Sequence, residues 1–266
     1  MKLYTNGCSF THGHDPFHYN EFTQAYNGFV YNSERYDYAW PWQLSKHFDF
    51  TFNHARYGTG IDRTLRTTLQ FINFIPDDEL SQWIFVIQAS QPSRKEYLHP
   101  NREVYGQIAP PGLGKQIDDM NQQYRTSKND DIHVVKYGND VLSDLSMEFY
   151  LEWESDEALA INQVKNILVL QDVFKSKGIK YLFTSMMKNH VTLEDQELRD
   201  SDLLQNLSKH INQNFIVPSI QEIMQGLAQK SYNDIDEHGS THPNKKGHNV
   251  IAQRLKNEME KRNWLI

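Results

Sequence analysis

The chain has 266 residues, of which 38% are hydrophobic and 23% are charged, and its formal net charge is -7. These values are typical of a globular protein with one large domain. An acidic chain repels phosphate backbones, so we expect no nucleic-acid partner. Cys8 is the only cysteine in the sequence, which excludes an intrachain disulfide and a cysteine-based zinc site.

The sequence shows no pattern of a targeting or membrane segment. No apolar run approaches the roughly 20 residues that a membrane helix needs. The first ten residues, MKLYTNGCSF, lack the apolar core of a signal peptide. We therefore expect no membrane partner and a cytoplasmic location, and we leave phage-associated or unconventional export open.

Predicted strands and helices alternate along the chain. In chain order, we expect a strand at 2–6, a helix at 40–48, a strand at 49–55, a helix at 62–75 and a strand at 83–88, then a helix at 155–177, a strand at 179–185, a helix at 203–214, a strand at 215–218 and helices at 219–230 and 244–262. The continuous apolar run from Trp83 to Gln88 is typical of a buried parallel strand. This alternation predicts an α/β fold, a three-layer α/β/α sandwich with a central, mostly parallel five-stranded sheet of the flavodoxin-like kind.

The segment 99–153 differs from the rest of the chain. It is rich in Asn, Gln, Asp, Pro and Gly and has few periodic stretches. We expect residues 1–266 to form a single domain, in which 99–153 is an insertion that serves as a lid or an oligomer contact. A surface excursion without a function of its own is an equal alternative, and homo-oligomerisation stays open.

Ser9 stands in a glycine-bounded turn after the first predicted strand. The run from Gly7 to Gly13 reads GCSFTHG, and open α/β sheets carry their sites at the carboxyl ends of strands. A serine on a tight turn there presents its hydroxyl outward, and its own N–H can face a developing oxyanion. A turn with a purely structural role is the alternative.

His242 stands near the other end of the chain, in the run HPNKKGH at 242–248. Pro243 suits the first position of the terminal helix. We therefore expect His242 just ahead of that helix, where it is held in the defined orientation that a base requires. A surface histidine in a turn is the alternative.

These two runs resemble the first and last blocks of the SGNH/GDSL hydrolase superfamily, Gly-Asp-Ser-x-Thr-x-Gly and His-Pro-x-x-x-Gly-His. The resemblance implies the SGNH hydrolase fold, with Ser9 as nucleophile and oxyanion donor and His242 as general base. Cys8 replaces the commonest Asp, and we expect it to be a packing residue rather than a nucleophile. We expect His248 to be structural.

The chain departs from the family pattern at the orienting acid. The family usually places an Asp three residues before the histidine, and Gly239 stands there in this sequence. We expect Asp236 to take the role, with Asp234, Glu237 or a Ser–His dyad as alternatives. The wrong orienting group lowers the rate without abolishing the chemistry.

The middle of the chain supplies the remaining candidates. The resemblance implies a glycine N–H in the oxyanion hole, which we assign to Gly58 with Gly60 as the alternative. The family's oxyanion Asn is absent, and Ser90 falls at its position after the strand at 83–88, with the side-chain amide of Gln88 or Gln91 as an alternative donor. We expect His12, Gln88 and Arg94 to contact substrate, although Arg94 fits a structural salt bridge equally well.

The expected function is that of a serine esterase that cleaves an ester, with an O-acetyl group on a carbohydrate as one substrate class. We expect no cofactor. The histidines and acid at positions 12, 14, 15 and 18 offer metal ligands, but no regular spacing places them on one face, so we expect no metal. Two other functions stay open. One is a binding or structural protein that kept the scaffold, and the other is an O-acyltransferase that acts on a glycan.

Overall fold

The structure is a computed structural model, and it describes residues 1–13, 39–56, 59–90, 92, 95–98, 105–108, 156–186, 201–216, 219, 220, 222, 233–235, 241–243 and 245–265. The strands are β1 (Lys2–Asn6), β2 (Phe50–Asn53), β3 (Trp83–Ala89), β4 (Lys95–Leu98), β5 (Tyr105–Ile108), β6 (Lys180–Ser185), β7 (Asn233–Ile235) and β8 (Thr241–Pro243). The α-helices are α1 (Ser9–His12), α2 (Trp40–Ser45), α3 (Ile61–Phe74), α6 (Asp156–Ser176), α7 (Asp202–Ser208) and α9 (Lys245–Lys261), and a 3-10 turn covers Leu80–Gln82.

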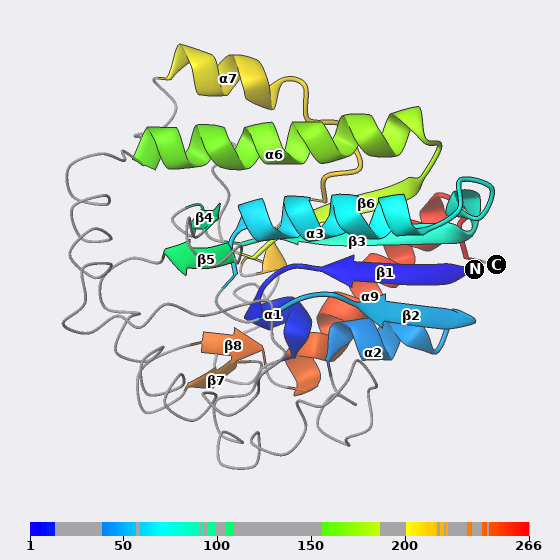
Figure 1. The fold of residues 1–266 in the computed structure, drawn as a ribbon. Coiled ribbons are helices and arrows are strands. Elements are labelled where there is room, and N and C mark those ends of the chain that lie inside the picture. The colour runs from blue at the N-terminus through cyan, green and yellow to red at the C-terminus, as the bar shows by residue number, and fades with distance from the viewer. Residues whose placement is uncertain are drawn as a thin grey trace.

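The central sheet has the order β2-β1-β3-β6, and its strands are parallel. The expected fifth strand, at 215–218, meets β6 at a single parallel bridge between Phe183 and Phe215; positions 217 and 218 lie outside the described residues. This order places the first strand inside the sheet and the second at its edge (Figure 1). The predicted α/β fold with a parallel sheet is confirmed.

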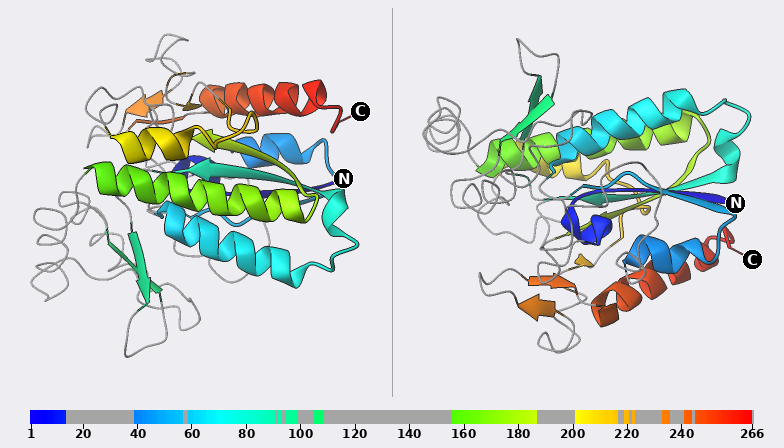
Figure 2. Two further views of the ribbon diagram at one scale, coloured as in Figure 1. Left: turned by 90° about the horizontal axis from the view of Figure 1, so that it is seen from above. Right: turned by 60° about the horizontal axis from the view of Figure 1, so that its bottom comes forward.

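Helices cover both faces of this sheet (Figure 2). Successive strand residues point to opposite faces, and the buried side chains follow that rule. One core packs Tyr4, Phe85 and Phe183 against α3 and α6. The other packs Leu3, Ile84 and Leu182 against α2 and α9. The three layers are therefore two helical layers with the sheet between them, as predicted.

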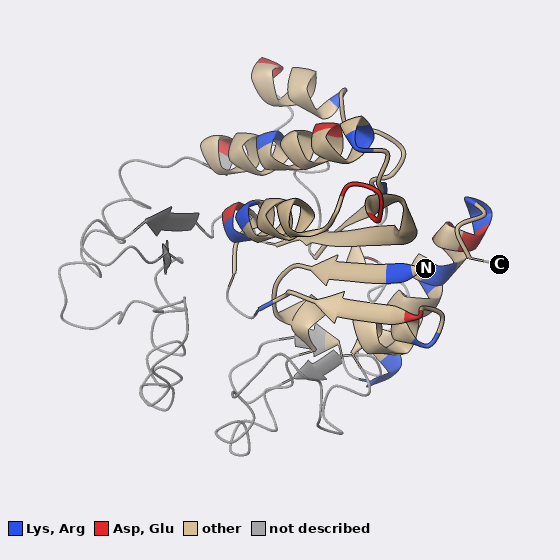
Figure 3. Cartoon of the chain, turned by 45° about the vertical axis from the view of Figure 1, so that its right-hand side comes forward, with Lys and Arg blue, Asp and Glu red and all other residues tan. Residues whose placement is uncertain are grey.

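Charged residues lie around the sheet rather than within it (Figure 3). Lys2 and Lys180 are the charged residues of the four central strands, and each is the first residue of its strand. A charge inside this sheet would be buried on both faces at a large desolvation cost. Within the described residues, no helix has the length and hydropathy that would let it span a bilayer.

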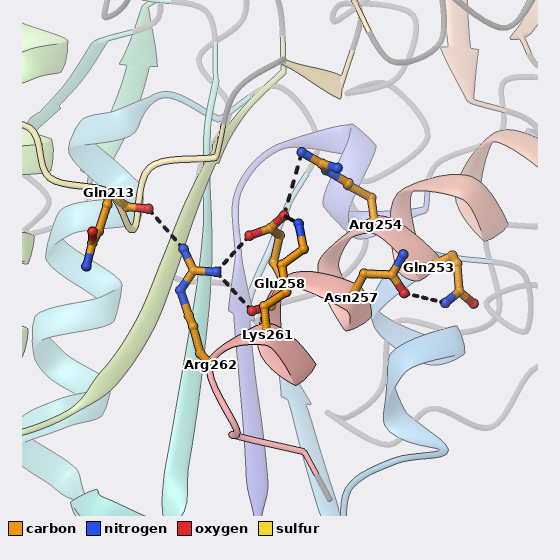
Figure 4. A network of polar contacts seen from close by, with 7 residues as sticks. All are labelled: Gln213, Gln253, Arg254, Asn257, Glu258, Lys261 and Arg262. Atoms are coloured by element: carbon orange, nitrogen blue, oxygen red, sulfur yellow. Dashed lines mark hydrogen bonds and ion pairs between the residues drawn. The ribbon is translucent and has the colours of Figure 1, made fainter.

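The last turn of α9 carries an ion-pair cluster around Glu258 (Figure 4). The Glu258 carboxylate lies 2.7 Å from Arg262 Nη1, 2.9 Å from Lys261 Nζ and 3.6 Å from Arg254 Nη2. Arg262 also donates to the carbonyl of Gln213 at 2.9 Å. Burial by itself raises the pKa of Glu258, but the hydrogen bonds from Arg262 and Lys261 and the nearby positive charges lower that pKa below its ordinary value. The cluster ties the end of the chain to the segment beside β6.

The helix expected at 203–214 is shorter in the structure, because α7 ends at Ser208. The side chain of Asn212 makes one local and one tertiary bond instead: its oxygen accepts from the N–H of Asn214 at 2.9 Å, and its amide donates to Tyr181 Oη at 2.6 Å. Asparagine side chains compete with the helical backbone in this way. The helix prediction was therefore wrong beyond Ser208.

The strands β4 and β5 pair antiparallel to form a separate two-stranded sheet. Apart from β5, the expected insertion at 99–153 lies outside the described residues. Its role as a lid or an oligomer contact, and the division of the chain into domains, stay predictions.

Candidate active site

Ser9 opens a very short helix directly after β1, and this single helical turn is the tight turn that we expected there. Cys8 is the extended N-cap of α1, and Gly13 closes it in the left-handed conformation with φ 85°. The Gly13 N–H donates to the carbonyl of Ser9 at 3.0 Å. Glycine suits such a C-terminal position because it has no Cβ to clash. The turn is thus a compact, closed unit that fixes the backbone of Ser9.

Hydrogen bonds fix both the N–H and the carbonyl group of Gly7. Its N–H donates to Asn6 Oδ1 at 2.9 Å, and its carbonyl accepts from Thr59 Oγ1 at 3.0 Å and from the N–H of Arg56 at 3.2 Å. Gly7 has φ 154°, and a Cβ placed on it would lie 2.7 Å from the Cβ of Gln88. Only glycine fits here, and the chain two residues before Ser9 is therefore fixed in position.

A buried polar network continues behind this turn to α3. The amide of Asn6 donates to Tyr4 Oη and to Thr67 Oγ1, both at 2.9 Å, and Asn6 is fully buried. Tyr4 Oη lies 3.2 Å from His54 Nδ1, and Arg63 donates to the carbonyl of His54 at 3.0 Å. Satisfied networks of this kind rigidify their surroundings. Sequence reasoning did not find these residues, because a polar strand end gives no signal of its partners.

Tyr4 and His54 of this network stay neutral near pH 7. Burial raises the pKa of Tyr4 well above its ordinary value. Burial, followed by the charges of Arg63, Arg56 and Arg66, lowers the pKa of His54 from 6.5 to about 3. A histidine with so low a pKa is uncharged at neutral pH. His54 is therefore a structural group of the network.

Cys8 is fully buried beneath the turn. Its sulfur lies 3.2 Å from the sulfur of Met186 and 3.7 Å from Oε1 of Gln88. Such contacts are those of a small packing residue. They agree with the packing role that we expected.

The end of β3 lies beside the turn. Asn6 of β1 pairs with Ile87 of β3, so Ser9 and Ser90 each stand three positions beyond a paired residue at the same edge of the sheet. Gln88 is fully buried, and its side-chain oxygen accepts a hydrogen bond from Thr11 Oγ1. The carbonyl of Ser90 accepts from Gln163 Nε2 at 2.5 Å. Among the described residues, Gln88 Nε2 and Ser90 Oγ have no hydrogen-bond partner.

His242 lies in the short strand β8 just ahead of the last helix, but the expectation that Pro243 is the first residue of that helix was wrong. Pro243 is the last residue of β8, and α9 begins only at Lys245. Proline has no N–H to continue a ladder, which suits it to a strand end. β8 pairs antiparallel with β7, and this register sets Asp234 opposite His242.

The two segments that carry the motifs meet at this point. Helix α1, which Ser9 opens, and strand β8, which carries His242, contact each other with Cα atoms within 8 Å (Figure 1). The segment that follows β8 is anchored by His248, which is buried and whose Nδ1 accepts from the N–H of Trp40 at 3.2 Å. This contact joins α9 to α2, in agreement with the expected structural role of His248.

Several predicted site residues cannot be placed. Gly58, Arg94, Asp236, Glu237 and Gly239 lie outside the described residues, as do His14, Asp15 and His18. Of the others, His12 is the last residue of α1 and Gly60 is the N-cap of α3. Within the described part of the chain, no cluster of three or more His, Cys, Asp or Glu residues has a metal-binding arrangement. The substrate contacts predicted for His12, Gln88 and Arg94 stay predictions.

No protein-family model and no curated protein matches the chain. Solved structures similar to it include an acetyl-xylooligosaccharide esterase variant from Geobacillus Stearmophilus, with 13% identity, 97% of this chain and 93% of that chain covered, and a TM-score of 0.45. A member of the lipolytic G-D-S-L family from Veillonella parvula has 10% identity, covers 97% of each chain and has a TM-score of 0.43. An α/β hydrolase from the Lake Arreo metagenome has 11% identity, 96% and 93% coverage and a TM-score of 0.45. At these values, the case for a function rests on the chain's own residues.

Proposed function

We propose that this chain is a serine hydrolase of the SGNH type, with Ser9 as nucleophile and His242 as general base. The observation that carries the proposal is the contact between α1 and β8. Each of these short elements holds the candidate catalytic residue of one motif, and the two motifs stand near opposite ends of the sequence. A nucleophile and its base must come together in the fold in this way.

In the proposed reaction, His242 accepts the proton of the Ser9 hydroxyl as its oxygen attacks an ester carbonyl. The tetrahedral intermediate collapses, and the alcohol leaves with the proton that His242 returns. Water, activated by His242, then attacks the acyl-serine and releases the acid.

The oxyanion hole in this proposal combines backbone and side-chain donors. Ser9 is the first residue of α1, and the first N–H groups of a helix have no acceptor within the helix. We assign the second donor to the N–H of Gly58 and the third to the Ser90 hydroxyl. Support for Ser90 comes from its place at the sheet edge beside Ser9 and from its buried Oγ, which lacks a partner among the described residues. Each such donor is worth about 10²–10³-fold in rate.

For the substrate, we propose an ester with a small acyl group, and an O-acetyl group on a carbohydrate as the first class to test. Ser9 is only 6% exposed, which favours a short acyl chain over a long one. The sequence holds 14 Tyr and 5 Trp, and aromatic residues of this kind serve sugar-facing surfaces well. A series of p-nitrophenyl esters tests the acyl length, with the acetate expected to react fastest.

Intact mass after treatment with a fluorophosphonate tests the nucleophile. We expect the wild-type protein to gain one adduct and the Ser9→Ala variant to gain none. Cys8→Ala is the matched control at the adjacent position and should still be labelled. A folded wild-type protein without an adduct would remove the hydrolase proposal.

A binding or structural protein is the second candidate, and the glycine at position 239 favours it, because the usual orienting acid is missing there. Absence of the adduct together with saturable binding of an acetylated glycan would support it. If acetyl groups pass to an added glycan rather than to water, the protein is an acyltransferase instead.

A further inference from the structure

The ribbon of β7 and β8 brings an acid to the level of His242. Its register pairs Asn233 with Pro243, Asp234 with His242 and Ile235 with Thr241. Residues directly opposite each other in an antiparallel pair share one face of the ribbon, with Cβ atoms about 4.5–5.5 Å apart. A carboxylic acid and a histidine therefore occupy paired positions on the strand that contacts α1.

We propose that Asp234 is the positioning acid for His242, an inference that rests on the proposed function. In serine hydrolases, an acid beside the base holds the imidazole in one tautomer and stabilises the imidazolium that forms. The position that usually supplies it, three residues before the histidine, is Gly239 here and has no carboxylate. Asp234 supplies the acid from the opposite strand.

The register favours Asp234 over Asp236, although Asp236 is the nearer of the two to His242 in the sequence. β7 ends at Ile235, so Asp234 is a paired residue of the ribbon and Asp236 follows its last pair. A paired residue has a defined place relative to its partner. The pairing therefore assigns to Asp234 the role that we first expected of Asp236.

Two variants with the same change of charge separate these acids. Asp234→Asn and Asp236→Asn are each compared with wild type for kcat and KM on p-nitrophenyl acetate. Asp234→Asn should lower kcat by up to about 10⁴-fold, the loss that follows a wrong tautomer in a serine protease triad, with KM little changed. Asp236→Asn should retain wild-type kcat. Thermal unfolding checks that both variants fold.

The pH profile supplies a readout that a purely structural role would not move. Loss of a neighbouring carboxylate makes the imidazolium less stable, so the acidic limb of kcat/KM should shift to lower pH in Asp234→Asn only. Other titratable or charged groups on α1 and on the first turn of α9, the elements next to β8, are His12, Lys245, Lys246 and His248. A Lys245→Gln variant, which should retain the wild-type limb, is the control for a charge on the helix that follows β8.

The outcomes distinguish this proposal from the proposed function. If wild type is labelled at Ser9 and Asp234→Asn retains its kcat and pH profile, Asp234 is not the positioning acid, although the hydrolase proposal stands. If wild type is not labelled, the hydrolase proposal falls. In that case, NMR titration of the His242 ring still tests the pair, because an unchanged midpoint in Asp234→Asn would overturn it.

Discussion

Replacing Gly7 by alanine tests whether the turn before Ser9 depends on close contact with β3. The new Cβ would lie 2.7 Å from both the Cβ of Gln88 and Oγ1 of Thr11, in a backbone with φ 154°. The Cβ of Gln88 is fixed to its strand and cannot swing away, so β1 and β3 must shift. Left-handed backbone costs a residue with a Cβ about 1–2 kcal/mol, and overpacking adds about 1–3 kcal/mol. We expect a total loss of about 2–5 kcal/mol.

Gly178→Ala is the matched control, because Gly178 also has positive φ, 64°, but a Cβ there would meet nothing within 4 Å. Its expected loss is the backbone cost alone, about 1–2 kcal/mol. Urea unfolding of the two variants and wild type measures the difference, and fluorophosphonate labelling should slow in Gly7→Ala alone. Equal losses of stability in the two variants would refute the argument that contact with β3 holds the turn.

Three further predictions concern buried polar groups. Ser90→Ala should lower kcat by about 10²–10³-fold. Its stability in thermal unfolding should not fall, because the change removes a buried hydroxyl that has no partner among the described residues. A variant with wild-type kcat would exclude Ser90 as an oxyanion donor. The pKa of His54 is about 3 in the folded protein, against an ordinary value of 6.5. The neutral ring therefore contributes fully to the free energy of unfolding above pH 6.5, and this contribution is lost as the pH falls toward 3. Between pH 7 and 5 the wild type should therefore lose about 2 kcal/mol more than His54→Gln in urea unfolding, and parallel profiles would contradict this. The pKa of Glu258 is lowered from its ordinary value of 4.5, so its charge stabilises the fold at pH values above 4.5 and this stability is lost as the pH falls below 4.5. Acidification should therefore destabilise wild type more than Glu258→Gln in chemical unfolding at several pH values. Equal acid sensitivity of the two proteins would count against the cluster in Figure 4.

Much of the fold could be predicted because its signals are local. The apolar run that begins at Trp83 became β3, buried along its whole length. Gly178 adopts positive φ just after α6, as a helix-ending glycine should. The bounds of α7 were mispredicted because the contacts of Asn212 with Tyr181 and Gln171 are tertiary. Local sequence patterns could not predict these tertiary contacts.

The sequence by itself determined the order along the chain of the central strands and of the longer helices beside them, the two candidate motifs and the edge of the sheet at which Ser9 would lie. These follow from periodicity, glycine positions and the rule that sites gather at the carboxyl ends of parallel strands. Only the tertiary structure decided that α1 contacts β8, that Gly7 lies against Gln88, and that Asp234 rather than a nearer residue is paired with His242. Strand register and the packing of distant segments depend on which surfaces are buried together, and that is a property of the whole folded chain.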